Sequence, residues 1–335
     1  MKALEGSTIL ITGGTGSFGQ HFVRTALARW APAAIRVYSR DELKQSEMAQ
    51  SLHDDRLRFF LGDVRDLGRL RRAVAGADIV IHAAALKQVP ACEYNPFEAV
   101  QTNILGTQNV ADACIDAGVR KAISLSTDKA VSPVNLYGAT KLCAEKLFIQ
   151  ANVYSGSRTT RFSCVRYGNV VGSRGSVVPL FRDQVAGGEL TVTDQRMTRF
   201  WISLDQAVEF VAGCLDTMRG GEVFVPKIPS MKVVDLAAAI APGLPVRFTG
   251  IRPGEKLHEL LLTAEEARRT LDAGYAYVVQ PEHSFWDVAG IADAVPVAED
   301  FVYSSDRNAS WLDVPALRKM LQSAASRDAV SAQAV

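Results

Sequence analysis

Five side chains able to do acid–base chemistry fall within one short stretch of the chain. Tyr137 and Lys141 stand four residues apart, so on a helix they lie on the same face. A phenol is a poor base near neutral pH, but a nearby ammonium favours its ionised form. Such a pair can take a hydroxyl proton while hydride leaves the same carbon. Thr127, Asp128 and Lys129 lie just upstream, and we predict that all five residues are catalytic.

Asp128 and Lys129 form an adjacent acid and base. Loss of water next to a ketone needs both, because one group removes the proton beside the carbonyl and the other protonates the departing hydroxyl. A protonated Asp128 beside a neutral Lys129 is a tautomer of the ion pair, so the sequence leaves open which residue is the acid. The neutral tautomer is accessible in a dry pocket, where charges are costly. Successive strand residues point to opposite faces, so both side chains reach one substrate only if the strand ends before them.

A glycine loop follows the first predicted strand, residues 8–12, and precedes a predicted helix over 20–29. Its glycines fit the dinucleotide fingerprint, in which small residues let the backbone approach a pyrophosphate at a helix N-terminus. The structural alternative is a tight turn between strand and helix. We predict cofactor contacts from Gly13, Thr15, Gly16, Ser17, Phe18 and Gly19.

The second predicted strand, residues 35–39, ends where an acidic residue would hold the ribose of NAD. This chain instead has Ser39 and Arg40 there, with Lys44 one helical turn further on. Two cations suit a 2′-phosphate, so the sequence favours NADP. The alternative is a pair of solvated charges at a helix start, with Asp41 as the helix cap.

Two further strand ends complete the predicted cofactor site. The third strand, residues 57–61, leads to Asp63, which is placed either to accept from the adenine amino group or to cap the helix beginning at Leu67. The fourth strand, residues 78–82, leads into small residues, as needed where a flat cofactor crosses a sheet. The cofactor contacts predicted here are Asp63, Val64, Ala83, Ala84 and Lys87, together with Tyr137 and Lys141.

Alternating strands and helices up to about residue 171 predict an α/β fold with a doubly wound parallel sheet, whose ligands bind beyond the carboxyl ends of the strands. We expect an NADP-binding Rossmann domain over 1–171, completed by about 203–226. A smaller, irregular α/β lid domain over 172–202 and 227–321 would bind the substrate. The Ala/Ser-rich tail, 322–335, has little apolar periodicity, and we expect it to be disordered.

Composition excludes several classes of partner. Lys and Arg total 37 against 36 Asp and Glu, so no global field attracts nucleic acid or an acidic membrane. The five cysteines are widely spaced and show no paired metal-ligand pattern, which predicts reduced thiols, no metal and a cytoplasmic protein. No run approaches the roughly 18 apolar residues that a membrane span needs.

The glycine loop and the Tyr-x-x-x-Lys motif together resemble the extended short-chain dehydrogenase/reductase superfamily. The resemblance is closer to the inverting UDP-N-acetylglucosamine 4,6-dehydratases, which start pseudaminic acid synthesis, although sugar-nucleotide 4,6-dehydratases in general usually show Thr-Asp-Glu where this chain has Lys129. The blocks that carry it are 39–48, 126–146, 166–179, 196–201 and 250–258.

This resemblance implies oxidation at C4 by NADP with Tyr137 and Lys141, water loss across C5 and C6, and return of hydride to C6. Lys129 would be the C5 base and Asp128 the acid, and C5 would be reprotonated from the opposite face. It also implies a homo-oligomer, often a hexamer, for which helices over 95–118 and 136–151 are suitable. The implied contacts to a UDP-sugar are Lys87, Asn169, Val177, Arg199, Arg252 and Glu255.

Several alternatives stay open. Arg199 and Arg252 are suited to gripping a phosphate, whereas Glu255 also reads as a first-turn helix carboxylate after Pro253. The function could be that of a dehydratase that retains C5 or epimerises further carbons. Less favoured are a UDP-sugar 4-epimerase, in which the Asp128–Lys129 pair would have no task, and a non-catalytic NADP-sensing protein.

Overall fold

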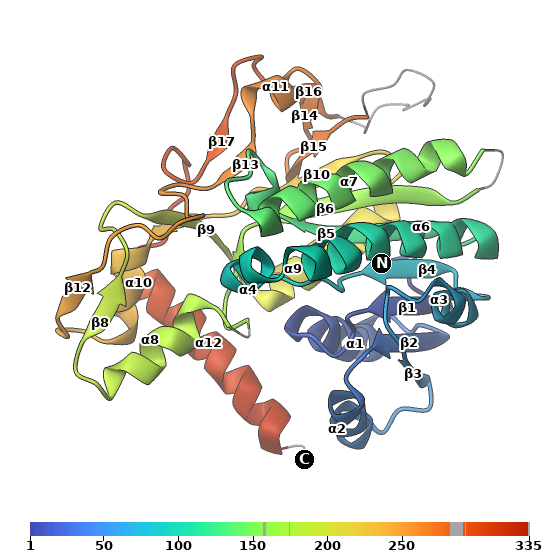
Figure 1. Ribbon diagram of the computed structural model, residues 1–335, viewed down its shortest axis with the longest axis horizontal. Helices are drawn as coiled ribbons and strands as arrows, with labels where there is room; N and C mark the ends of the chain where they lie inside the picture. The colour runs from blue at the N-terminus through green and yellow to red at the C-terminus, as the bar shows by residue number, and fades with distance from the viewer. Residues whose placement is uncertain (157–158, 174, 282–290, 292, 334–335) are drawn as a thin grey trace.

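The computed structural model describes residues 1–156, 159–173, 175–281, 291 and 293–333. A ten-stranded sheet runs through the molecule, and the expected α/β fold is confirmed (Figure 1). From β3 to β10 neighbouring strands are parallel, and β15, β14 and β16 are joined on as antiparallel pairs. In spatial order the strands are β16 Val295–Pro296, β14 Thr270–Asp272, β15 Ala276–Val279, β10 Val223–Pro226, β6 Arg161–Tyr167, β5 Lys121–Thr127, β4 Ile79–His82, β1 Thr8–Thr12, β2 Ala34–Ser39 and β3 Leu57–Leu61.

Helices cover both faces of the sheet, as the near-continuous apolar runs of its central strands require. Figure 1 shows α6 and α7 side by side across one face, and α1 packs with α9 on the other. The helical segments are α1 Ser17–Arg29, α2 Glu42–Leu52, α3 Leu67–Val74, α4 Val89–Tyr94, α5 Pro96–Ala99, the π-helix η1 Val100–Leu105, α6 Gly106–Ala117, the 3₁₀ turn η2 Asp128–Ala130, α7 Leu136–Tyr154, α8 Val177–Val185, α9 Leu204–Thr217, α10 Val233–Ile240, α11 Ala264–Ala267 and α12 Val314–Gln333.

Side-chain caps fix where the helices that carry the site begin. Asn135 accepts a hydrogen bond from the Gly138 backbone N–H at 2.8 Å and so starts α7. Ser203 forms a capping box with Gln206 at the start of α9. These caps satisfy backbone N–H groups that the first turn of a helix leaves unpaired.

A second apolar core lies beside the main one and includes Val178, Trp201, Leu236 and Leu317. It supports α8, α10 and α12, which form the separate lobe seen in Figure 1. The smaller strands are β7 Asn169–Val170, β9 Thr198–Ile202 and β11 Ser230–Lys232 in one sheet, β8 Leu190–Val192 with β12 Val246–Phe248, and β13 Leu260–Leu262 with β17 Tyr303–Ser304.

The structure differs from the expected division in one respect. Parts of the chain after residue 227, which the sequence assigned to the lid, belong to the main body. Strands β14, β15 and β16 extend the main sheet, and Leu261 packs in the first core. Residues 282–290 and 292 of the expected lid lie outside the described residues. The proposed lid is therefore continuous with the Rossmann sheet on one side.

The expectation of a disordered tail from residue 322 is wrong for the described part of the tail. Helix α12 continues to Gln333, while residues 334 and 335 lie outside the described residues. Leu317 and Leu321 anchor the helix in the second core, and propagation costs little in an Ala-rich segment once a helix has begun. Over the described ranges, none of the helices combines the length and apolarity needed to cross a bilayer.

Candidate active site

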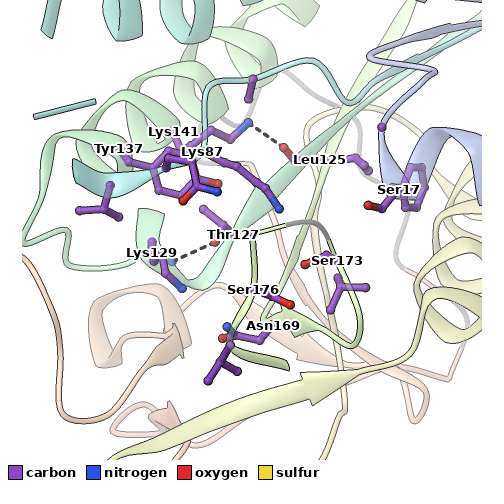
Figure 2. A pocket seen from close by; sticks show the side chains of 18 of the residues that line it. Ser17, Lys87, Leu125, Thr127, Lys129, Tyr137, Lys141, Asn169, Ser173 and Ser176 are labelled. Atoms are coloured by element: carbon purple, nitrogen blue, oxygen red, sulfur yellow. Dashed lines mark hydrogen bonds between the residues drawn. The ribbon is translucent and has the colours of Figure 1, made fainter. Parts of the chain in front are cut away.

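A cleft of about 1110 Å³ opens at the carboxyl ends of the parallel strands. The structure brings the predicted site residues together around it, except Asp128, whose side chain is buried behind Lys129. Figure 2 shows side chains from several elements converging on this space. The predicted residues that line it are Gly13, Thr15, Gly16, Ser17, Phe18, Gly19, Ser39, Arg40, Lys44, Asp63, Val64, Ala83, Ala84, Lys87, Thr127, Lys129, Tyr137, Lys141, Asn169, Val177, Arg199, Arg252 and Glu255.

The glycine loop has the close contacts that a dinucleotide cradle needs. Gly13 has a φ of +66°, and a Cβ added there would lie 2.9 Å from the Ala84 backbone. A Cβ at Gly19 would lie 2.5 Å from the Gly14 carbonyl oxygen. Helix α1 has Gly16 as its N-cap and no side-chain cap, so the positive end of its dipole is available to a pyrophosphate.

Arg40 and Lys44 reach the cleft, and each already faces a carboxylate. Arg40 Nη1 lies 3.4 Å from Asp63 Oδ2, and the Lys44 ammonium pairs with Asp41. Asp41 also caps α2, as the sequence alternative predicted. The alternative that Asp63 caps α3 is wrong, because Asp66 occupies that position.

Tyr137 and Lys141 lie one turn apart on α7, and both side chains are in the cleft wall. Lys141 Nζ donates to the Leu125 carbonyl oxygen at 2.7 Å, which fixes the ammonium behind the phenol. Burial lowers the pKa of Lys141. Burial also raises the pKa of Tyr137 to about 12, and the positive charge of Lys129 opposes this rise only in part. The protein groups alone therefore favour a phenol, and the expected phenolate needs a further positive charge.

The strand that leads into the acid–base pair ends before Asp128 and Lys129. Strand β5 stops at Thr127, and Asp128–Ala130 form the 3₁₀ turn η2, capped by the Thr127 hydroxyl. This turn lets both side chains lie on the same side of the backbone. Lys129 Nζ lies 3.1 Å from Asp128 Oδ1, and the Thr127 hydroxyl donates to the same oxygen at 2.9 Å. The strand therefore ends where the sequence required, but of the pair Lys129 lines the cleft and Asp128 is fully buried behind it.

The charge state of Lys129 is set by two carboxylates. Burial favours the neutral amine, but the charges of Asp128 and Glu259 outweigh burial and raise the pKa of Lys129 above its ordinary value. Glu259 Oε1 lies 3.5 Å from Lys129 Nζ, and Arg199 packs on the far side of the same carboxylate. The resting pair is therefore ionic, and the neutral tautomer is reached when one proton crosses from Nζ to Asp128.

Polar groups without protein partners face the other side of the cleft. Among the described residues, Asn169 Oδ1 and Ser176 Oγ are buried and make no hydrogen bond. Ser176 precedes Val177, the first residue of α8, so a helix N-terminus also faces this space (Figure 2). Arg252 at the rim pairs with Glu255 at 2.6 Å. Arg174, in the resemblance block, lies outside the described residues. These groups fit a polar, anionic ligand.

Sequence reasoning missed Gly138, Lys256 and Glu259. A Cβ at Gly138 would lie 2.1 Å from the Lys129 carbonyl oxygen, so α7 packs directly on the acid–base turn. Lys256 Nζ lies 3.8 Å from Glu259 Oε2. Glu259 comes one residue after the resemblance block 250–258, and nothing in its local sequence indicates burial. Within the described ranges, no group of three His, Cys, Asp or Glu side chains could hold a metal ion.

A family described as polysaccharide biosynthesis protein matches residues 9–281. The chain belongs to this family. A curated relative from Campylobacter jejuni strain 81-176, a UDP-N-acetylglucosamine 4,6-dehydratase (inverting), is 51% identical over 316 residues, covering 92% of this chain and 95% of the relative. A UDP-glucose 4-epimerase from Rickettsia canadensis is 43% identical over 282 residues, covering 81% of this chain and 82% of the relative.

Solved structures of similar fold agree with this membership. The X-ray structure of Pen from Bacillus thuringiensis is 36% identical, with a TM-score of 0.89 over 96% of this chain and 99% of that one. A dTDP-glucose 4,6-dehydratase from Streptomyces venezuelae, determined with NAD bound, is 27% identical, with a TM-score of 0.67 over 75% of this chain and 86% of that one. A fold similar to that of this chain thus accommodates NAD in a sugar-nucleotide dehydratase.

Proposed function

We propose that this chain is a UDP-N-acetylglucosamine 4,6-dehydratase that inverts C5. The observation that carries the proposal is the ion pair of the buried Asp128 with the partly exposed Lys129, next to Tyr137 in a cleft that also holds a glycine-rich dinucleotide cradle. The similarity to the Campylobacter jejuni enzyme supports the substrate and the inversion. The product would be UDP-2-acetamido-2,6-dideoxy-β-L-arabino-hex-4-ulose, a starting point for pseudaminic acid and flagellin glycosylation.

Each side chain has a defined task in this reaction. Tyr137 takes the proton of the C4 hydroxyl as a phenolate, which the Lys141 ammonium, fixed by the Leu125 carbonyl oxygen, and the positive charge of a bound oxidised nicotinamide would stabilise. One proton first crosses the 3.1 Å from Lys129 to Asp128. Lys129 then removes the C5 proton, and the C–H electrons form the C5=C6 bond. The C6–O bond breaks as the hydroxyl receives the proton of Asp128 through the Thr127 hydroxyl, which lines the cleft 2.9 Å from Asp128 Oδ1, and the hydroxyl leaves as water. Return of a proton to C5 from the opposite face completes the inversion.

A bound nicotinamide dinucleotide would supply the redox chemistry, as acceptor of a hydride from C4 and donor of that hydride to C6. The residues that would hold it are the glycine loop, with Ser39, Arg40 and Lys44 at the adenosine end. We propose NADP, because Arg40 and Lys44 reach the cleft at the end of β2 and no acidic residue occupies position 39 or 40.

Replacing Arg40 with alanine is expected to reduce the preference for NADP over NAD by about tenfold or more, since one charge-assisted contact to the 2′-phosphate is lost. Binding of the two cofactors to the purified variant, followed by tryptophan or nicotinamide fluorescence, measures the preference. The matched control is Arg58→Ala, an exposed arginine that does not line the cleft. An unchanged preference would mean that Arg40 is a solvated charge at the start of a helix and does not bind the 2′-phosphate.

The proposal extends to a homo-oligomer, a hexamer by resemblance. Large apolar side chains are exposed on the helices expected to form a subunit bundle, and they include Phe97, Leu105 and Leu147. Exposed apolar clusters of this kind are typical of protein interfaces. All five cysteines are free thiols, which supports the proposed cytoplasmic setting.

The competing functions are weaker on chemical grounds. A UDP-sugar 4-epimerase, the activity of the Rickettsia relative, needs hydride transfer at C4 alone and leaves the Asp128–Lys129 pair without a task. A cofactor-sensing protein would not need the Tyr137–Lys141 pair either. A dehydratase that retains C5 uses the same groups, so it differs only in the stereochemistry of reprotonation.

Incubating the protein with UDP-N-acetylglucosamine in deuterated water and following the sugar by NMR separates these functions. We expect a 4-keto-6-deoxy product with deuterium at C5 and inverted C5 configuration, because the proton that Lys129 removes is replaced from the opposite face by one that derives from the solvent. Retained C5 configuration would overturn the inverting assignment. A C4 epimer that lacks a C6 methyl group would overturn dehydration itself.

A further inference from the structure

Glu259 is a buried carboxylate among cations at the base of the cleft. Its side chain is 3% exposed, and Oε1 lies 3.5 Å from Lys129 Nζ and 3.8 Å from Arg199 Nε. Oε2 lies 3.8 Å from Lys256 Nζ and has no hydrogen-bond partner among the described residues. No motif or proposed step has assigned a task to this residue.

The backbone at Glu259 is held independently of its side chain. Its N–H donates to Ser305 Oγ at 2.9 Å, and its carbonyl oxygen accepts from the Ser305 N–H at 2.9 Å. Strand β13 then begins at Leu260. The carboxylate is therefore not needed to form these contacts, and a buried charge without a full set of hydrogen bonds is costly unless it serves another purpose.

The charges facing Lys129 come from every element packed on it. Asp128 belongs to the same turn, Tyr137 to α7 and Arg199 to β9, whereas Lys87, Lys256 and Glu259 come from loops. Three of these neighbours are cations, so Asp128 alone would leave Lys129 in a strongly positive environment. Glu259 is the second negative charge in contact with Lys129 among the described residues.

We propose that Glu259 is a positioning residue of the water-loss step, holding Lys129 in the cleft and stabilising the positive charge that it gains from the C5 proton. This inference rests on the proposed function. As the C5–H bond breaks, the amine becomes an ammonium while Asp128 gives its proton to the departing hydroxyl. A carboxylate already fixed 3.5 Å from Nζ stabilises that charge without rearrangement. Arg199 and Lys256 hold the carboxylate in place from its other sides.

The proposal predicts that Glu259→Gln slows water loss and spares oxidation at C4. In a single turnover, reduced cofactor should form at the normal rate and then decay about ten- to a hundredfold more slowly, because charge develops on Lys129 only in the second step. A merely structural residue would slow both steps together. Glu265→Gln, a nearby exposed glutamate outside the cleft, is the matched control and should leave both rates unchanged.

Acetylation of Lys129 in the chain without cofactor or substrate gives a readout that does not depend on the reaction. Loss of the Glu259 charge lowers the pKa of Lys129, so a larger fraction is neutral and Lys129 should be acetylated faster at the same pH. Peptide mass spectrometry measures this rate against Lys146, an exposed lysine outside the cleft. Glu259→Asp keeps the charge and should fall between the wild type and Glu259→Gln.

The outcomes separate the two proposals. If the wild type does not dehydrate UDP-N-acetylglucosamine, the proposed function fails, yet faster acetylation of Lys129 in Glu259→Gln would still support the coupling of the two residues. Unchanged acetylation, or equal slowing of both kinetic steps, would overturn the role of Glu259. If Glu259→Gln does not fold, Glu259→Asp carries the test, with slowed decay of reduced cofactor and normal formation expected.

Discussion

Replacing Lys129 with methionine is expected to abolish water loss while oxidation at C4 survives. Methionine keeps most of the length of the side chain but removes the amine that takes the C5 proton, so the loss should be on the order of 10²- to 10⁴-fold, typical for a proton-transfer group. Reduced cofactor should therefore accumulate on addition of UDP-N-acetylglucosamine, and no 6-deoxy product should appear. Absorbance of the reduced nicotinamide and NMR of the sugar measure the two steps separately.

Lys146→Met is the matched control for this experiment, because Lys146 lies on the exposed side of α7 and does not line the cleft. It should retain the full rate of both steps. Normal product formation by Lys129→Met would remove Lys129 from the reaction. If Lys129→Met also failed to reduce the cofactor, Lys129 would instead belong to the oxidation step. Its ion pair with Asp128, at 3.1 Å, does not require such a role.

Replacing Gly138 with alanine is expected to reduce both stability and activity. The added methyl carbon would lie 2.1 Å from the Lys129 carbonyl oxygen and 3.1 Å from Pro133 Cβ, so the 3₁₀ turn and the first turn of α7 must move apart. Overpacking of this kind costs about 1–3 kcal/mol of unfolding free energy. The shift also moves Lys129 relative to Tyr137, and a misplacement of about 1 Å can cost on the order of 10²-fold in rate. Urea unfolding and the dehydratase assay measure the two effects.

Gly213→Ala tests whether the effect belongs to the contact or to any helical glycine. Gly213 lies within α9, and a Cβ there would meet no heavy atom within 4 Å. Alanine should therefore leave activity unchanged and raise the unfolding free energy by up to about 1 kcal/mol, since alanine favours the helix more than glycine. If Gly138→Ala keeps full activity and stability, as expected for Gly213→Ala, the packing of α7 on the acid–base turn does not affect the reaction.

The parts of the site that follow from sequence are those encoded locally. The glycine loop is a run of neighbours after a strand, and Tyr137 and Lys141 share a helix face because of their spacing. Adjacency alone brought Asp128 and Lys129 together as a candidate pair. The sequence also indicates that the strand must end before this pair, and β5 does end at Thr127.

The parts that sequence reasoning missed depend on contacts between distant segments. Glu259 is far from Lys129 in the chain, and its neighbours give no sign that it is buried among cations. The close approach of Gly138 to Lys129 is likewise a property of how α7 packs. The ionic resting state of Lys129 follows from Asp128 together with the distant Glu259, which is why the expectation of an accessible neutral pair was incomplete.

The antiparallel pairing of β15 with β10 bears on how the chain can be divided. A fragment ending after β10 would expose the outer backbone N–H and C=O groups of that strand. In the whole chain these groups pair with β15. Open strand edges with apolar sequences such as Val223–Pro226 recruit other chains and aggregate. The same edge is open during synthesis until β15, Ala276–Val279, has been made, so this strand protects the sheet although it lies outside the acid–base site.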